Sequence, residues 1–255
     1  MVNALIGAIL IGLSLGVFGS GGSILTVPVL MYLVHMPAEL AIASSLLIVA
    51  GISLFGAMLH VRKKLISWPH LWLFGVPGMF GTYAGAWVGT SVDPRWQLLV
   101  FVMLMAIAAV FMWRNAVQPV AAVANALPQK LQVGRVLVDG LVVGAITGFV
   151  GVGGGFLIVP ALVLLGGLGL PLAIGTSLAI ITLKSVAGFW KYYAVLSAAN
   201  YSFDWLVIGL MIAGGIAGSW LGVFIGTRLP KAKLQQGFAI FLLVMGGFVL
   251  LRSVL

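Results

Sequence analysis

The sequence contains the same glycine-rich segment twice, once in each half. Residues 16–28 read GVFGSGGSILTVP, and residues 148–160 read GFVGVGGGFLIVP, 132 positions further along. The register continues, because LAIASSL at 40–46 matches LAIGTSL at 172–178 with the same offset. An offset of 137 then aligns Trp68 with Trp205 and the glycines at 81, 85 and 89 with those at 218, 222 and 226. The chain is therefore expected to fold as two equivalent halves.

Both copies lie inside long apolar stretches. Hydrophobic residues make up 62% of the chain and charged residues 7%, a composition that suits lipid rather than water as the solvent. Glycines spaced four residues apart let membrane helices pack closely. Each half divides into five apolar segments, namely 3–18, 23–35, 38–60, 69–91 and 95–113, then 136–150, 155–168, 171–196, 204–227 and 233–252. We expect an all-α, polytopic membrane protein with a first repeat at 1–114, a cytoplasmic linker at 115–132 and a second repeat at 133–255.

Segment length decides how the glycine segments are used. Residues 3–35 as one helix would be about 50 Å long at about 1.5 Å per residue, whereas the hydrocarbon core is about 30 Å thick. Each glycine segment is thus expected to form the tip of a helical hairpin, followed by three spanning helices, with up to ten helices in all. An odd number of crossings per half makes the two repeats inverted relative to each other.

Basic residues favour the same hairpin topology. It places nine of them on one face and three, Arg95, Lys191 and Arg252, on the other, as the positive-inside rule prefers. The net charge of +9 is explained in this way, and no basic stripe for a nucleic acid is evident. The nine residues are Arg62, Lys63, Lys64, Arg114, Lys130, Arg135, Arg228, Lys231 and Lys233.

Repeated halves interrupted by glycine are typical of secondary transporters, whose substrate sites form where broken helices meet near the bilayer midplane. Backbone N–H groups and helix N-termini at the two tips would favour an anion. The alternative is that glycine only permits a tight turn or close packing. The candidate tip residues are Gly19, Ser20, Gly21, Gly22 and Ser23 in the first half and Gly151, Val152, Gly153, Gly154 and Gly155 in the second.

Lys184 stands near the middle of an apolar segment, and its counterpart in the first half is Ile52. A lysine at membrane depth marks a pathway or a partner by default. The acidic residues Glu39, Asp93, Asp139 and Asp204 all lie near segment ends, so an anionic substrate is the expected counter-ion. Snorkelling of the lysine to an interface is the alternative. The hydroxyls of Ser44, Ser45, Thr176 and Ser177 open two of the helices, and could bind an oxyanion or cap the helices.

The sequence lacks the residues that several other functions require. The chain has no cysteine, and His35, His60 and His70 have no carboxylate at metal-ligand spacing. No protease-like set lies at membrane depth, so we expect no catalytic residue, metal or cofactor. The expected partners are a small anion and the lipid bilayer, with no nucleic acid; a homodimer is compatible with the sequence. An anion channel is the alternative to a carrier, and a membrane-embedded enzyme is a remoter one.

The paired glycine segments, the segments 43–46 and 175–178, and the loop from His60 to Trp68 resemble the sulfite exporter TauE/SafE family of membrane permeases. The resemblance covers nearly the whole chain. It implies transport of a small sulfur-containing anion, such as sulfite, sulfoacetate, thiosulfate or an aromatic sulfonate, across a bacterial cytoplasmic (inner) membrane. It also implies an anion-site role for the glycine tips and the helix starts after them. The loop departs from the family in one position: Ser67 stands where an acidic residue is usual, whereas Asp204 precedes Trp205 in the second half.

Overall fold

The computed structural model describes residues 2–18, 23–117, 133–151, 154–164, 166–226 and 231–254, and within these ranges it consists of ten α-helices and no strand. Each half has a medium helix, a ten-residue helix and then three long helices, so the expected repeat is confirmed in the order of elements. The first half contains α1 (Val2–Phe18), α2 (Ser23–Tyr32), α3 (Ala38–Arg62), α4 (Trp68–Thr90) and α5 (Pro94–Val117). The second contains α7 (Val133–Val150), α8 (Gly155–Leu164), α9 (Leu170–Ala198), α10 (Trp205–Gly226) and α11 (Lys231–Val254).

Helix length and composition agree with a membrane protein that crosses the bilayer several times. Four helices are long and apolar enough to span, with spans at Ala38–Arg62, Val133–Val150, Pro171–Ala198 and Trp205–Gly222. The ten-residue helices α2 and α8 are about 15 Å long at about 1.5 Å per residue, half the thickness of the hydrocarbon core. The second limb of each hairpin is therefore a half-span.

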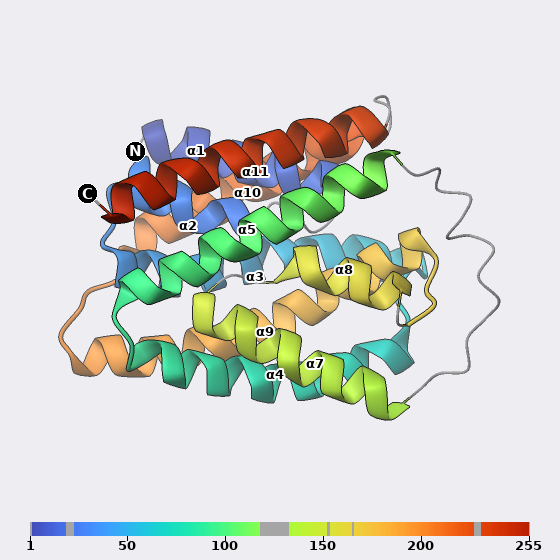
Figure 1. The fold of residues 1–255 in the computed structure, drawn as a ribbon, viewed down its shortest axis with the longest axis horizontal. Helices are drawn as coiled ribbons and strands as arrows, with labels where there is room; N and C mark the ends of the chain where they lie inside the picture. Colours follow the sequence, from blue (N-terminus) through green and yellow to red (C-terminus); the bar gives the residue numbers. More distant parts are fainter. Residues whose placement is uncertain are drawn as a thin grey trace.

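The two halves run in opposite directions (Figure 1). Helix α1 starts at the end of the molecule where both chain termini lie, whereas α7 starts at the opposite end. We call these the terminal end and the linker end. The linker end carries the last turns of α3 and α5 and the first turns of α7 and α11, which hold most of the nine basic residues. The expected position of the basic residues at one end of the molecule is confirmed for these helix ends. Lys130, Arg228 and most of the predicted linker lie outside the described residues.

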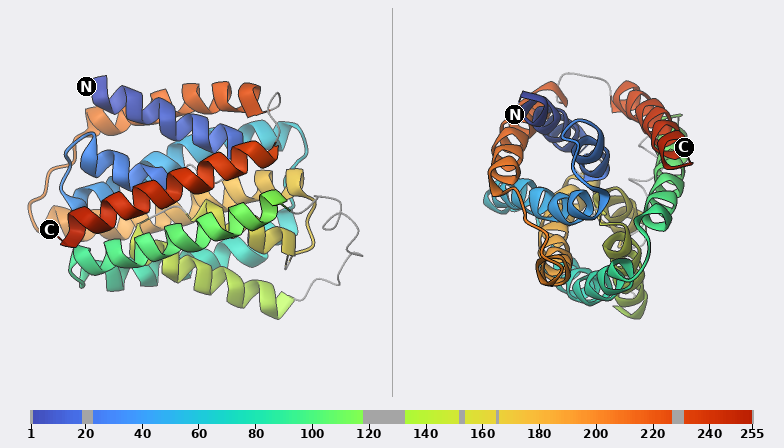
Figure 2. Two further views of the ribbon diagram at one scale, coloured as in Figure 1. Left: turned by 45° about the horizontal axis from the view of Figure 1, so that its top comes forward. Right: turned by 90° about the vertical axis from the view of Figure 1, so that its left-hand side faces the viewer.

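Helices from the two halves pack against each other in matching pairs. Helix α4 packs on α7, α1 on α10, and α3 on α9, while α5 and α11 lie side by side along one flank (Figure 2). The central helices α3 and α9 are more deeply buried than α7 and α10. A Cβ on Gly81 would lie 2.1 Å from the Leu141 carbonyl oxygen, and one on Gly218 would lie 2.5 Å from that of Ile9. The expected role of the four-residue glycine spacing in close helix packing is thus confirmed.

Candidate substrate site

Lys184 lies inside the bundle and does not extend to a surface. Its side chain is 1% exposed, and its Nζ has no hydrogen-bond partner among the described residues. The snorkelling alternative is therefore wrong for this lysine, because a snorkelling ammonium would be accessible. A buried ammonium without a partner is energetically costly, and a bound anion beside it would reduce that cost.

The internal repeat defines what surrounds the lysine. A Cβ on Gly78 of α4 would lie 3.0 Å from Lys184 Cδ and 3.3 Å from the Gly140 carbonyl oxygen of α7. For the first-half counterpart of Lys184, a Cβ on Gly215 of α10 would lie 2.2 Å from Ile52 Cδ1. Lys184 and Ile52 thus occupy equivalent places, each against a glycine of the neighbouring helix. Only the second half puts a charge there.

Other buried polar groups without a hydrogen-bond partner occur on the same central helices. Ser53 of α3 and Ser185 of α9 are both fully buried, and neither Oγ has a partner in the described ranges. They are counterparts at the 132-residue offset and directly follow Ile52 and Lys184. Unsatisfied hydroxyls inside a bundle are costly, so the middle of the α3–α9 pair holds several groups that could donate to a bound oxyanion.

The four candidate hydroxyls lie further into their helices than the sequence indicated. Helices α3 and α9 begin at Ala38 and Leu170, so Ser44 and Thr176 are each the seventh residue and neither caps a helix. The expectation that these residues open the helices is wrong, because Pro37 and Gly169 stand at the caps.

Three of the four hydroxyls are used by the protein itself. Ser45 Oγ bonds the carbonyl oxygens of Ile42, at 2.8 Å, and of Gly151, while Ser177 Oγ donates to Ile174 at 2.8 Å. Thr176 Oγ1 donates to the Leu172 carbonyl at 2.7 Å. Ser44 Oγ alone has no partner in the described part of the chain.

The second glycine tip packs against α3. Gly151 and Gly154 have φ values of +71° and +73°, which side-chain-bearing residues rarely adopt. A Cβ on Gly151 would also lie 2.1 Å from Ile42 Cγ2, so this turn needs glycine for both conformation and space. Gly155 is the first residue of α8, and the half-spans α2 and α8 contact each other.

The first tip is described only at its last residue. Ser23 is fully buried and begins α2. The remaining predicted tip residues lie outside the described residues, namely Gly19, Ser20, Gly21 and Gly22, together with Val152 and Gly153 of the second tip. Their anion-site role stays a prediction.

Sequence reasoning missed three hydrogen bonds of Tyr192 and Gln97 close to the second tip and one buried carboxylate oxygen. Tyr192 donates to the Phe149 carbonyl at 3.0 Å, and Gln97 Nε2 donates to the Gly89 carbonyl at 2.6 Å and to Tyr192 Oη at 3.2 Å. A glutamine in an apolar segment was the available signal. Asp139 is the seventh residue of α7, and its Oδ2 is buried without a partner in the described residues. It therefore lies deeper than its place in the sequence indicated.

Comparison with known proteins matches nearly the whole chain. The model of the family described as "Sulfite exporter TauE/SafE" covers residues 4–249. The chain belongs to the TauE/SafE family. Among relatives of this TauE/SafE protein, a "Probable membrane transporter protein" of Xylella fastidiosa is 32% identical over 96% of this chain and 92% of its own. Those of Haemophilus influenzae and Bacillus subtilis (YunE) are 26% and 25% identical, each with 94% of its own length covered. No solved structure matches the chain.

Family membership and the helices together establish the general class of the molecule. This TauE/SafE protein is a multi-pass membrane protein and a member of a transporter family. The resemblance drawn from the glycine segments is confirmed.

Proposed function

We propose that this protein is an alternating-access carrier for a small sulfur-containing oxyanion, such as sulfite, sulfoacetate, thiosulfate or another organosulfonate. The observation that carries the proposal is the Lys184 ammonium, which is buried and lacks a partner among the described residues. An anion that enters the bundle supplies the missing counter-charge. The family description as a sulfite exporter supports this substrate class.

The proposed site combines a point charge with neutral donors. Lys184 provides a compact cation with three donors, which suits an anion of pyramidal or tetrahedral shape. Hydroxyl and backbone N–H groups add directional hydrogen bonds without further charge, so the anion can be released again. We assign the neutral donors to the glycine tips and to Ser44, with Ser53 and Ser185 as additional hydroxyls on the central helices.

We place the protein in the cytoplasmic membrane of a bacterium, with the linker end in the cytoplasm. The positive-inside rule supports this orientation, because most of the basic residues cluster at the linker end. The Xylella, Haemophilus and Bacillus relatives are bacterial membrane transporters by name, which supports the compartment. We propose no enzymatic step.

The test compares two lysines of the same helix in reconstituted vesicles. Lys184→Gln should lower saturable sulfite or organosulfonate uptake by at least about 10-fold, because the neutral amide cannot compensate the charge of the anion. Lys191→Gln, seven residues further along α9, should leave uptake within about twofold, because its Nζ lies 5.7 Å from the centre of the exposed Tyr83 ring and its side chain is only partly buried. Equal transport by Lys184→Gln and the unmodified protein would contradict the proposal.

The substrate and the mode of transport are tested separately. Binding to the purified protein should be measured for sulfite, thiosulfate, sulfoacetate, sulfate and an aromatic sulfonate. A carrier gives uptake that saturates with concentration, whereas an anion channel gives single-channel currents in a planar bilayer. Such currents would replace the carrier with a channel while leaving Lys184 as the anion site.

A further inference from the structure

At the linker end, the connection before α4 is hydrogen-bonded to the second half. The Ser67 N–H donates to Thr176 Oγ1 at 2.9 Å, and His70 Nε2 lies 3.1 Å from the Gly166 carbonyl oxygen. Ser67 Oγ lies 2.8 Å from His70 Nδ1. Because a carbonyl only accepts, Nε2 carries the hydrogen, and in the neutral imidazole Nδ1 accepts the serine proton. We call Ser67, His70, Gly166 and Thr176 the linker-end latch.

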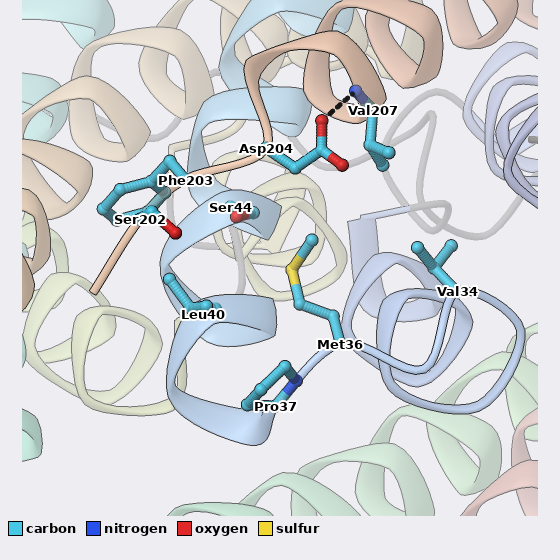
Figure 3. Close-up of a pocket in the computed structure, with 9 residues that line it drawn as sticks. All are labelled: Val34, Met36, Pro37, Leu40, Ser44, Ser202, Phe203, Asp204 and Val207. Carbon is cyan, nitrogen blue, oxygen red and sulfur yellow. Dashed lines mark hydrogen bonds between the residues drawn. The ribbon is translucent and has the colours of Figure 1, made fainter.

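The repeat places four counterparts at the terminal end. The two sequence offsets match Ser67 with Asp204, His70 with Val207, Gly166 with Val34, and Thr176 with Ser44. All four counterparts line one cavity of about 210 Å³ (Figure 3). Its other lining residues, at 36, 37, 40, 202 and 203, are in turn counterparts of residues at 168, 169, 172, 65 and 66 beside the latch. Equivalent residues of the two halves are thus hydrogen-bonded at the linker end and separated by a cavity at the terminal end.

Side chains in the cavity are not engaged across it. Ser44 Oγ is buried and has no partner among the described residues, although Thr176, its counterpart, accepts the Ser67 N–H. Asp204 Oδ1 accepts a hydrogen bond from the Val207 N–H in the first turn of α10 at 3.0 Å, and makes no bond across the cavity to a described residue (Figure 3). Val34, Asp204 and Val207 also line a second cavity of about 380 Å³, so the open region extends beside α1.

We infer that these two sets of residues are the gates of the carrier. This inference rests on the proposed alternating access and deepens it. The structure is the state closed at the linker end and open at the terminal end. When the carrier switches, the linker-end latch separates and the connection before α10 moves onto α3. The Asp204 N–H then donates to Ser44 Oγ, as the Ser67 N–H now donates to Thr176.

The two gates differ in strength. Val207 has no donor to replace His70 Nε2, so the terminal gate lacks the bond to residue 34. The linker gate also fits more tightly, because a Cβ on Gly175 would lie 2.0 Å from the Leu65 carbonyl oxygen, whereas the counterpart of Gly175 is Ala43, which carries a Cβ. The state closed at the linker end is therefore favoured without substrate.

Disulfide cross-linking tests the gates, since the chain has no cysteine of its own. Two double variants are made, Ser67→Cys with Thr176→Cys and Ser44→Cys with Asp204→Cys. After mild oxidation in proteoliposomes without substrate, mass spectrometry should find the first pair largely cross-linked and the second pair largely free. Equal cross-linking of both pairs would overturn the inference.

His70→Val, which copies Val207, supplies the second arm. It removes the one hydrogen bond that His70 makes across the closed gate, to the Gly166 carbonyl, together with the local contact to Ser67 Oγ. Loss of the bond across the gate should shift cross-linking toward the 44–204 pair by about 2- to 10-fold, the range of one net hydrogen bond. An unchanged ratio in the His70→Val background would also overturn the inference. Cross-linking is read without a transport assay. If cross-linking changes as expected but the vesicles transport no sulfur oxyanion, the proposed substrate would be refuted and the assignment of the gates would stand.

Discussion

Ile52 and Lys184 occupy the same place in the two halves of the molecule, yet only Lys184 can carry the positive charge that the proposed anion site requires. Each side chain packs on a glycine of a neighbouring helix, Gly215 for Ile52 and Gly78 for Lys184. The duplicated sequence therefore provides a symmetric scaffold, on which a single substitution makes the chemistry one-sided. Both side chains are almost completely buried, so the difference lies in charge and not in access.

The comparison separates residues that build the scaffold from residues that give it a function. Scaffold substitutions should have similar effects at counterpart positions, because the contacts are repeated. Functional substitutions should have an effect in one half only. The variants below test this distinction from the largest expected effect to the smallest.

Replacing Lys184 with methionine should have the largest effect on transport. Methionine keeps the unbranched shape but removes the charge, and a charge-assisted hydrogen bond contributes about 1.5–3 kcal/mol. Transport efficiency should therefore fall by about 10- to 150-fold for that bond alone. The thermal unfolding temperature in detergent should stay equal or rise, because an apolar side chain in place of a buried charge is often neutral or stabilising.

Ile52→Met is the matched control for that variant. This variant also introduces methionine, but at the first-half counterpart of Lys184. Its transport rate should stay within about twofold of the unmodified protein, because a volume-conserving apolar exchange is well tolerated. If Lys184→Met and Ile52→Met reduced transport equally, the one-sided view of the site would be wrong.

Alanine at Gly81 or Gly218 should destabilise the protein to a similar degree in both halves. The new Cβ would lie 2.1 Å from the Leu141 carbonyl oxygen in the first case and 2.5 Å from that of Ile9 in the second. Backbone contacts of this kind force the helices apart, at a cost of about 1–3 kcal/mol. Thermal unfolding in detergent measures this loss of stability. Transport per folded molecule should stay close to that of the unmodified protein.

Gly209→Ala is the control for these glycines. A Cβ there meets nothing within 4 Å, so alanine should be neutral or stabilising by up to about 1 kcal/mol in a helix. A loss of stability at Gly209 matching that at Gly218 would mean that helix packing is not the reason for the glycine spacing.

The sequence predicted the scaffold well because its signals are local and repeated. Apolar segment lengths, the glycine tips and the basic residues were enough for the hairpins, the inverted halves and the charged end. The hydroxyls of Ser44 and Thr176 were misplaced because Pro37 and Gly169 start the helices earlier. The latch was not predicted, since the contact between Ser67 and Thr176 joins residues 109 positions apart and depends on how the halves dock.

Gly151→Ala should cost about 1–2 kcal/mol from backbone conformation alone, because alanine disfavours the left-handed region. The Ile42 side chain must also move, so the second tip should lose its contact with α3. We expect lower stability together with weaker anion binding, measured on the purified protein. The sequence counterpart is Gly19, and Gly19→Ala should have an equal effect if the two tips share one conformation. A neutral Gly151→Ala variant would contradict the assigned turn.

Tyr192→Phe should have the smallest effect, about 1 kcal/mol of stability for a lost hydrogen bond. The change leaves the part-buried Phe149 carbonyl and the Gln97 amide without the phenol, while the ring still packs. Its counterpart is His60, whose Nδ1 lies 2.8 Å from the Gly56 carbonyl oxygen of its own helix, so His60 does not repeat the tyrosine contact. Tyr193→Phe is the control, because that ring stacks with Phe189 and Phe203 and keeps these contacts without a hydroxyl. Stability should fall for Tyr192→Phe and change by less than about 0.5 kcal/mol for Tyr193→Phe. Equal effects of the two changes would mean that the phenol of Tyr192 contributes no stabilising hydrogen bond beside the second tip.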